Sequence, residues 1–501
     1  MRRQRLTLGL ASGTLVAVSA LVATGFGPLG AAAGAAQARH DSGGTVLQTN
    51  LVSDLPGAAG VTDPNLINPW GISESGTSPF WISDNNAGLS TLYQVPGAAS
   101  APVSINPLAV NIPTPVGLTD GTPTGTVFNA GVTGGAFPIT GLNKSGQQTT
   151  APAVFLFDTE DGTIVGWNPG IDPSQNFAGP GGVSAQGVIA IDSSGNNFTN
   201  PDPAQQTGAV YKGLAIATAS TPIIASDANS TSVLYASNFR AGTIEVYDAH
   251  FTKVTSLPAS AFADPDLPRG YAPFNVQVLN GKVYVTYARQ DADRHDDAAG
   301  SGRGFVDVFN LDGTPGLAHR TIRLVSRGSL DSPWGLAIAP QNFAGTQAPG
   351  NDPVLLVGNF GNGFINSFDA VSGKRLGQLK DPDGEAIQID GLWALKVGNG
   401  GAGGLADTVY FTAGLFGESH GLFGALSTVA AGTPEGPAEA QWVQANLDLV
   451  QLDLQQLTQD TSSGASAATI KQDADTLHAD TRHLLHVERD FAKDALDDAS
   501  H

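Results

Sequence analysis

The stretch ASNFRAGTIEVYD, residues 236–248, has a close copy further along the chain, VGNFGNGFINSFD, residues 357–369. Both follow the pattern Asn-Phe-x-x-Gly-x-Ile-x-x-aromatic-Asp, in which a glycine precedes a run typical of a β-strand. Aligning the chain on this glycine yields six copies, at Gly88, Gly162, Gly242, Gly304, Gly363 and Gly421. The chain is therefore built from a repeated β-rich unit.

A second signature lies upstream of each copy of the first. It reads PWGIS from Pro69, PVGL from Pro115, YKGLAI from Tyr211, PFNVQV from Pro273, PWGLAI from Pro333 and LWALKV from Leu392. The units recur at about 40 to 75 residues, a period typical of propeller blades. We predict an all-β, six-bladed β-propeller, with the second signature as the innermost strand of each blade and the glycine at the next hairpin turn.

Composition excludes several classes of protein. The net charge is −21 and the pI about 4.6, which argues against nucleic acid as a partner, because phosphate contacts need clustered Lys and Arg. The same charge argues against adhesion to an anionic membrane. The chain has no cysteine, so it forms no disulfides and has no thiolate metal ligands or cysteine nucleophile. Stability must come from a buried core.

The N-terminus has the pattern of an export signal. A basic start is followed by an apolar run and then by small residues that end in Ala36-Gln37-Ala38. We predict a signal peptide over residues 1–38, cleaved near Ala38, by either the general secretory or the twin-arginine route. The mature protein would then be extracytoplasmic and without stable membrane insertion.

The pattern also divides the rest of the chain. We place the propeller at residues 45–427, a linker at 428–436 and an acidic α-helical hairpin at 437–497, where apolar residues recur at helical spacing. The last repeat lacks an outer strand of its own. We expect TVLQTNLVS, residues 45–53, to pair into the sixth blade and close the ring.

One rim of the propeller should gather polar side chains, because the starts of the inner strands and the predicted turns fall on the same face. Propeller mouths of this kind are common ligand sites, and the ligand-binding candidates there are Asn68, Trp70, Asp84, Asn238, Asp331, Asn359 and Asp390. Asn and Asp at such positions also cap their own turns, and that alternative explains their recurrence in several blades.

Two turns break the repeat, and function is expected there rather than in the symmetric positions. Metal candidates in the fourth copy are Asp291, Asp293, Asp296 and Asp297, and catalytic candidates in the fourth and sixth copies are Asp293, His295, Glu418 and His420. Carboxylates with a histidine coordinate metals or act as general acid and base. The alternative is a solvated acidic loop, since the spacing lacks the glycine and terminal glutamate of an EF-hand.

An aromatic column runs through four copies of the second signature, and a small residue follows the column in most copies. The column consists of Trp70, Phe274, Trp334 and Trp393. Exposed at the mouth, these rings would stack on a flat ligand. Packed against neighbouring blades, they would instead form the core.

Three long segments carry a family resemblance: NLVSDLPGAAGVTDPNLINPWGIS from residue 50, DADRHDDAAGSGRGFVDVFNLDG from residue 291 and FTAGLFGESHGLFGAL from residue 411. With them the chain resembles a family of uncharacterised secreted bacterial proteins, first catalogued beside PEP-CTERM sorting signals. The resemblance implies a six-bladed propeller and export, but no reaction. The chain departs from the sorting label, because its tail lacks a Pro-Glu-Pro box and a terminal hydrophobic span.

More distantly, the strand pattern is similar to that of NHL-repeat and gluconolactonase-type propellers, some of which hold Ca²⁺ at the mouth. The expected function is a scaffold that binds an extracellular small molecule or protein. The alternative is a Ca²⁺-dependent hydrolase or lyase that acts on a small molecule at the mouth.

Overall fold

A computed structural model describes residues 45–96, 102–115, 121–318 and 321–430, together with residues 454–455, 457–459 and 461–462. The predicted signal peptide, most of the linker and nearly all of the predicted helical hairpin lie outside the described residues. The described helices include none with the length and apolar character needed to cross a membrane.

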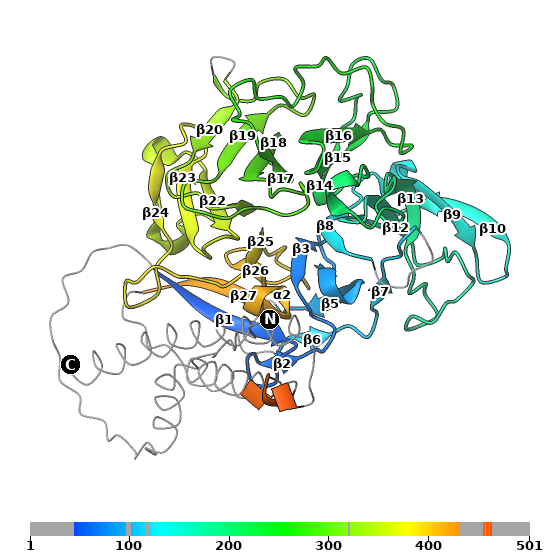
Figure 1. The fold of residues 1–501 in the computed structure, drawn as a ribbon, viewed down its shortest axis with the longest axis horizontal. Coiled ribbons are helices and arrows are strands. Elements are labelled where there is room, and N and C mark those ends of the chain that lie inside the picture. The colour runs from blue at the N-terminus through cyan, green and yellow to red at the C-terminus, as the bar shows by residue number, and fades with distance from the viewer. Residues whose placement is uncertain are drawn as a thin grey trace, which may run out of the picture. The chain divides into compact units, whose positions relative to one another are not determined.

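The predicted six-bladed propeller is confirmed, since six sheets follow one another around a common centre (Figure 1). The first sheet contains β3 (Pro69–Ser73), β4 (Phe80–Asp84), β5 (Leu89–Gln94), β6 (Ser104–Ile105) and β7 (Val110–Asn111). The second contains β8 (Pro123–Phe128), β11 (Phe155–Thr159), β12 (Thr163–Trp167) and β13 (Val188–Asp192). The third contains β14 (Tyr211–Thr218), β15 (Ser232–Asn238) and β16 (Thr243–Tyr247).

The fourth sheet contains β17 (Tyr271–Leu279), β18 (Lys282–Arg289), β19 (Phe305–Phe309) and β20 (Arg323–Ser326). The fifth contains β21 (Pro333–Ile338), β22 (Val354–Asn359), β23 (Ile365–Asp369) and β24 (Arg375–Gln378). The sixth contains β25 (Leu392–Val397), β26 (Val409–Gly414), β27 (His420–Val429), β1 (Thr45–Ser53) and β2 (Val61–Thr62).

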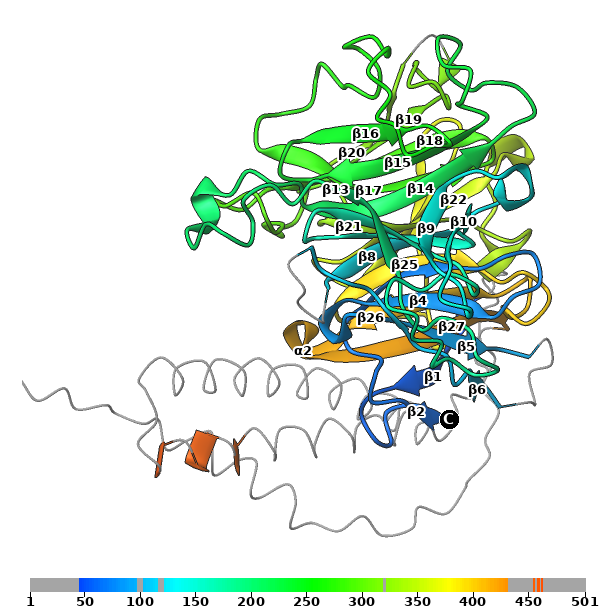
Figure 2. The ribbon, with the colours of Figure 1, turned by 90° about the vertical axis from the view of Figure 1, so that its right-hand side faces the viewer.

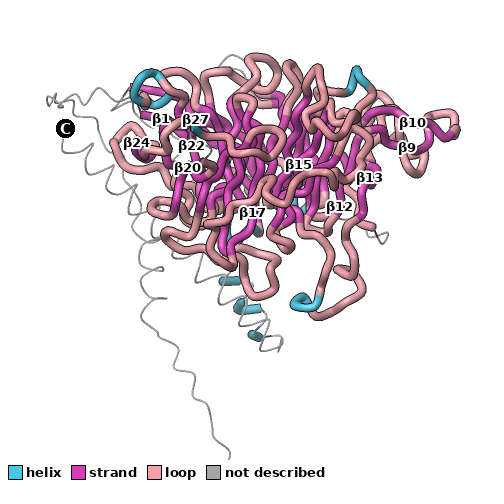
Figure 3. Tube along the Cα trace, turned by 90° about the horizontal axis from the view of Figure 1, so that it is seen from above, coloured by secondary structure: helices cyan, strands magenta, loops and turns pink. Residues whose placement is uncertain are grey.

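Short elements occupy the connections between strands. A hairpin of β9 (Pro138–Leu142) and β10 (Gln148–Pro152) projects from the second blade (Figure 3). The short helices are η1 (Asn85–Ala87), η2 (Val132–Gly134), η3 (Pro203–Gln205), η5 (Phe343–Gly345), η6 (Pro349–Asn351) and α2 (Leu415–Glu418).

The sixth sheet joins the two ends of the described propeller. Strand β1 runs antiparallel to β27, from the pair Thr45 and Val429 to the pair Ser53 and Leu422. Val46 and Val52 on β1 are fully buried. The outermost part of the sixth sheet is thus made from a segment that precedes the first blade.

The inner strand of the second blade is a correction to the sequence interpretation. The pattern PVGL predicted a strand from Pro115, whereas the structure begins β8 at Pro123 and places Gly125 in the crowded position. A Cβ atom on Gly125 would lie 2.2 Å from the backbone nitrogen of Leu214 on the next inner strand. The preference for small residues there follows from this close approach of backbones.

The repeated turn glycines have different conformations in different blades. Positive φ angles occur in the first, second, third and fifth copies, at Gly88, Gly162, Gly242 and Gly363. Gly304 and Gly421 do not share this conformation, and the positive φ angles nearby fall instead on Gly302, Phe416, Gly417 and Glu418. The fourth and sixth turns therefore depart from the repeat in backbone conformation as well as in sequence.

The aromatic column forms a buried plug at the centre of the ring. The ring centroids of Trp70 and Trp393 lie 3.5 Å apart, and those of Trp70 and Trp334 lie 6.2 Å apart. Trp70 and Trp334 belong to the first and fifth blades, which are not neighbours, so their rings meet across the centre. Phe274 from the fourth blade lies 5.9 Å from Trp393. These rings are core, not an exposed stacking surface.

Candidate functional site

A buried lysine lies at the start of the third blade's inner strand. Lys212 is 1% exposed, and its Nζ donates hydrogen bonds to Glu160 Oε1 and, at 2.9 Å, to Asp296 Oδ1. The same nitrogen lies 5.1 Å from the centre of the Trp70 ring. Burial alone would lower the lysine's pKa, but the two carboxylates raise it above its usual range. Lys212 is therefore a fixed positive charge on top of the aromatic plug.

The three charged partners come from three blades. Glu160 lies in the turn between β11 and β12, Lys212 is the second residue of β14, and Asp296 lies in the long loop between β18 and β19. They meet because an inner strand begins on the same face of a propeller as the turn that follows the second strand. The repeat geometry thus places them at one mouth of the channel.

His295 forms an ordered pair with Asp296. Its Nδ1 lies 3.0 Å from Asp296 Oδ1, and its backbone nitrogen donates to Asp291 Oδ1 at 2.9 Å. The hydrogen bond to Asp296 raises the pKa of His295. Although burial opposes it, the hydrogen bond from His295 and the charge of Lys212 hold the pKa of Asp296 well below its usual range. The imidazole is thereby oriented by a permanent anion.

Glu160, Lys212, His295 and Asp296 together form a charge cluster. Glu418 from the sixth blade lies close enough for the carboxylates and the ammonium group of this cluster to act on it. Its Oε2 accepts a hydrogen bond of 3.0 Å from Asn68 Nδ2, and Asn68 Oδ1 accepts one of 3.0 Å from Trp393 Nε1. Burial, followed by the charge of Glu160, raises the pKa of Glu418 to about 7. Asn68 and Glu418 both have positive φ angles, 47° and 72°, a conformation that is uncommon for residues other than glycine. Strained backbone of this kind often occurs at functional sites.

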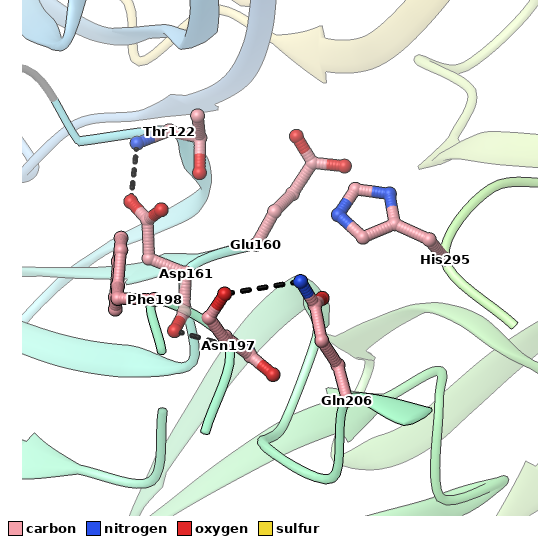
Figure 4. A pocket seen from close by; sticks show the side chains of 7 residues that line it. All are labelled: Thr122, Glu160, Asp161, Asn197, Phe198, Gln206 and His295. Atoms are coloured by element: carbon pink, nitrogen blue, oxygen red, sulfur yellow. Dashed lines mark hydrogen bonds between the residues drawn. The ribbon is translucent and has the colours of Figure 1, made fainter. Parts of the chain in front are cut away.

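A pocket of about 170 Å³ opens beside the charge cluster (Figure 4). It is lined by Thr122, Glu160, Asp161, Asn197, Phe198, Gln206 and His295. Glu160 and His295 point toward one another in the close-up, with Asp161 and Phe198 on another side of the space (Figure 4).

Asp161 and Thr122 form one polar side of the pocket. Asp161 Oδ2 accepts the backbone N–H of Thr122 at 2.8 Å. Burial raises the pKa of Asp161. The hydroxyl of Thr122 is buried and forms no hydrogen bond within the protein. The carboxyl group of Asp161 keeps acceptor capacity for a ligand that donates hydrogen bonds, since a carboxylate can accept several.

A buried arginine holds the outer wall of the pocket. Arg240 Nη1 donates to Asn197 Oδ1 at 2.7 Å, and Nη2 donates to Gln206 Oε1 at 3.2 Å. Gln206 Nε2 in turn donates to the backbone oxygen of Asn197 at 3.0 Å. The loop that carries η3 projects from the same side of the sheets as α2 (Figure 2). The wall is therefore tied to the third blade rather than left as a free loop.

The symmetric rim candidates act mainly as caps of turns and loops. Their contacts are Asp84 Oδ2 with Thr91 N, Asn238 Oδ1 with Ala241 N, Asn359 Nδ2 with Ser329 O, Asp331 Oδ1 with Gly300 N, and Asp390 Oδ2 with Phe416 N. Asp331 and Asp390 hold the two irregular loops. Of the ligand-binding candidates, Asn68 donates a hydrogen bond to Glu418, and Trp70 lies under the Lys212 ammonium group.

The other candidates in the two irregular loops are Asp291, Asp293, Asp297 and His420, and they have different partners. Asp291 Oδ1 accepts the backbone N–H of His295, and burial raises the pKa of Asp297. Burial lowers the pKa of Arg240, and the charges of Asp291 and Asp293 oppose this shift. His420 turns to a different partner, because its Nδ1 lies 2.6 Å from Asp54 Oδ2. The structure thus brings together His295, Asp296 and Glu418, and places His420 against the segment that follows β1.

Sequence reasoning missed Glu160, Asp161 and Lys212. A signal for the lysine was present, because Lys212 occupies the position in YKGLAI that is Trp or Phe in four other copies. A charged residue at a position that is aromatic in four other copies indicates that this blade has a polar site where the others have core. The adjacent acids had no such signal, since a turn preceding a glycine is commonly acidic.

A calcium ion needs a different set of ligands from the one that Glu160, His295 and Asp296 offer. Glu160, His295 and Asp296 each present one ligand atom, and these atoms lie within 4.8 Å of one another. Ca²⁺ takes six to eight oxygen ligands, whereas this set includes an imidazole, and the ammonium group of Lys212 already contacts both carboxylates. These residues do not fit Ca²⁺ while Lys212 is in place.

Comparison with known proteins identifies relatives of unknown activity. An uncharacterised protein of Acanthamoeba polyphaga mimivirus is 31% identical over 351 residues, which cover 69% of this chain and 72% of the viral protein. The chain belongs to the same family as this protein. A second uncharacterised mimivirus protein in the family is 30% identical over 386 residues, covering 75% of this chain and 84% of its own length. No family model matches the chain.

Solved structures with a similar arrangement have low sequence identity. An α-L-arabinofuranosidase from Fusarium graminearum covers 76% of this chain and 98% of its own, at 8% identity and a TM-score of 0.42. An aldose sugar dehydrogenase from Streptomyces coelicolor covers 77% and 98%, at 11% identity and a TM-score of 0.40. Likenesses at this level support no inference about activity.

Proposed function

We propose that this protein is an exported binding protein that takes a small polar ligand in the pocket at the propeller mouth. The observation that carries the proposal is the pocket lined by Asp161, His295 and Phe198, which brings a carboxyl group, an imidazole and an aromatic ring around one small space. The wall is rigid, because Arg240 and Lys212 tie its loops to neighbouring blades. A pre-formed polar site of this kind favours binding with little reorganisation.

The pocket's size and lining indicate the class of ligand. Its volume of about 170 Å³ lies below the roughly 300–1,000 Å³ of sites for drug-sized molecules, so the ligand is small. Carboxyl, hydroxyl and imidazole groups surround the space, and Phe198 supplies an apolar face. Hydroxyl-rich molecules such as monosaccharides and polyols combine hydrogen-bonding edges with an apolar C–H face, and they fit this lining.

The test is a binding screen with a matched pair of variants. Monosaccharides, polyols and small amines are titrated into the protein by calorimetry, and hits are repeated with D161N and F198A. Both changes should weaken binding, whereas D266N, which alters an exposed carboxylate, should leave it unchanged. A ligand that binds all four proteins equally would place the site elsewhere.

Acid–base chemistry at the same pocket is a second proposal. His295 is oriented by Asp296 and faces a cavity that also holds Asp161, whose pKa is raised. An imidazole oriented by an anion, beside a second carboxyl group, is an arrangement that hydrolytic and lyase enzymes use. The test is to look for product formation from any ligand that binds. If H295A still binds the ligand but forms no product, the protein is an enzyme that uses His295.

Export is proposed on the N-terminal pattern. Expression of the full chain in a secreting bacterial host should release a protein whose N-terminal sequence begins after Ala38. Recovery of the intact N-terminus in the cytoplasm would contradict this proposal.

A further inference from the structure

We propose that the ammonium group of Lys212 occupies the cation position of the propeller mouth, so that the site works without a divalent metal ion. The proposal concerns the charge that holds the pocket wall, not the ligand. It can therefore stand or fall independently of the proposed binding function.

The contacts of Lys212 are those expected of a resident cation. Its nitrogen contacts the carboxylates of Glu160 and Asp296, and the face of the Trp70 ring lies on a further side. The Glu160 side chain is 11% exposed and that of Lys212 is 2% exposed, whereas that of Asp296 is 63% exposed. Glu160 in particular needs a compensating positive charge, because an unpaired buried charge is strongly unfavourable. Lys212 supplies that charge from the third blade, where four other blades have an aromatic ring.

The same lysine positions the pocket. Glu160 lines the pocket directly, and Asp296 orients His295, which lines it opposite Glu160. One cation therefore fixes two walls that come from the second and fourth blades. A metal ion bound by Glu160, His295 and Asp296 would do the same work, since these residues already present ligand atoms within 4.8 Å of one another.

The donor set defines which metal could replace the lysine. Two carboxylates and one imidazole suit Zn²⁺, Mn²⁺ or Co²⁺, whereas Ca²⁺ prefers oxygen ligands throughout. Removing the ammonium group while keeping the three ligands should therefore create a site for a borderline transition metal rather than for Ca²⁺.

The experiment compares metal binding by the wild type and by K212A, using Mn²⁺ and Zn²⁺ as probes. Wild-type protein should contain no stoichiometric metal after purification, and EDTA should leave its melting temperature unchanged. K212A should bind about one metal ion per chain, and the ion should raise its melting temperature, because a ligand specific to the native state stabilises that state. K253A, which removes the exposed lysine that pairs with Glu245, should gain no metal.

A double variant ties the new site to the proposed ligands. Adding H295A to K212A should weaken metal binding by at least about tenfold, since even residues behind the ligands contribute this much. The proposal is overturned if folded K212A binds no metal, or if its metal binding is insensitive to H295A. It is also overturned if the wild type binds one equivalent of metal and E160Q abolishes this binding. In that case a metal ion, and not the Lys212 ammonium group, would occupy the site beside Glu160.

If K212A does not fold, the metal content of the wild type after purification still tests the proposal. K212M then serves as the second variant, because its side chain keeps apolar contact with Trp70 without the charge. Recovery of folded K212M in the presence of Mn²⁺ or Zn²⁺, and not of Ca²⁺, supports the proposal, and failure with all three ions contradicts it.

Discussion

Replacing Glu418 with glutamine should stabilise the protein above pH 7 and change its stability little near pH 5. Burial, followed by the negative charge of Glu160, raises the pKa of Glu418 from its ordinary value of 4.5 to about 7. Glutamine keeps the acceptor for Asn68 Nδ2 but carries no charge. It therefore imitates the protonated form of the glutamate at every pH.

Proton linkage fixes the direction and the size of the effect. The folded protein keeps a proton on Glu418 at pH values where the unfolded chain has released it, so stability from this group is complete below pH 4.5 and is lost as the pH rises through about 7. At about 1.4 kcal/mol for each pKa unit, the change from 4.5 to about 7 corresponds to about 3 kcal/mol. That is a substantial share of a typical total of about 5–15 kcal/mol.

Urea unfolding of the wild type and E418Q between about pH 5 and about pH 8 measures the effect. The difference in the free energy of unfolding should grow in favour of E418Q as the pH rises. The matched control is E385Q, which alters an exposed glutamate and should show no such trend. A difference that stays constant across this range would show that Glu418 ionises normally and that the electrostatic description of the mouth is wrong.

Three further predictions concern the plug, the sixth blade and the pocket wall. W334A removes a ring that is 2% exposed at the centre of the propeller and should cost about 3–5 kcal/mol in denaturant unfolding, whereas V371A, at a site 55% exposed, should change stability by less than about 0.5 kcal/mol. We infer that β1 closes the ring, so deletion of residues 1–53 should expose the edge of β27 and cause aggregation or loss of cooperative unfolding, while deletion of residues 1–44 should not. R240M should release the loop around η3 and speed limited proteolysis there, detected by mass spectrometry of the fragments; equal cleavage rates would show that Arg240 is not what holds the loop.

The sequence was informative about the fold because each blade is a local object. Alternating strands and turn glycines act within one blade, and the repetition of the pattern in six copies reinforces one signal. The prediction from the sequence was wrong at the inner strand of the second blade. The second blade begins its inner strand at Pro123 rather than near Pro115, because backbone crowding against Leu214 selects Gly125 and not the first small residue in the pattern.

The candidate site was predicted in part. The broken turns pointed to His295, Asp296 and Glu418, and the structure brings these residues to one mouth. His420 lies in the same turn as Glu418 yet pairs with Asp54. Spacing could not separate these two residues, because the positive φ angles at Phe416, Gly417 and Glu418 redirect the chain within a few positions.

What the sequence determined by itself is the repeated blade, the existence of an aromatic column and the two turns at which the repeat breaks. The tertiary structure decided that the column is buried. Only the tertiary structure decided that Lys212 lies between Glu160 and Asp296, residues 52 and 84 positions away along the chain. No local pattern records such a meeting, since an ion pair is specified by where three blades converge and not by the neighbours of any one charge. The charge was visible in the sequence, but its partners could be identified only from the arrangement of the blades.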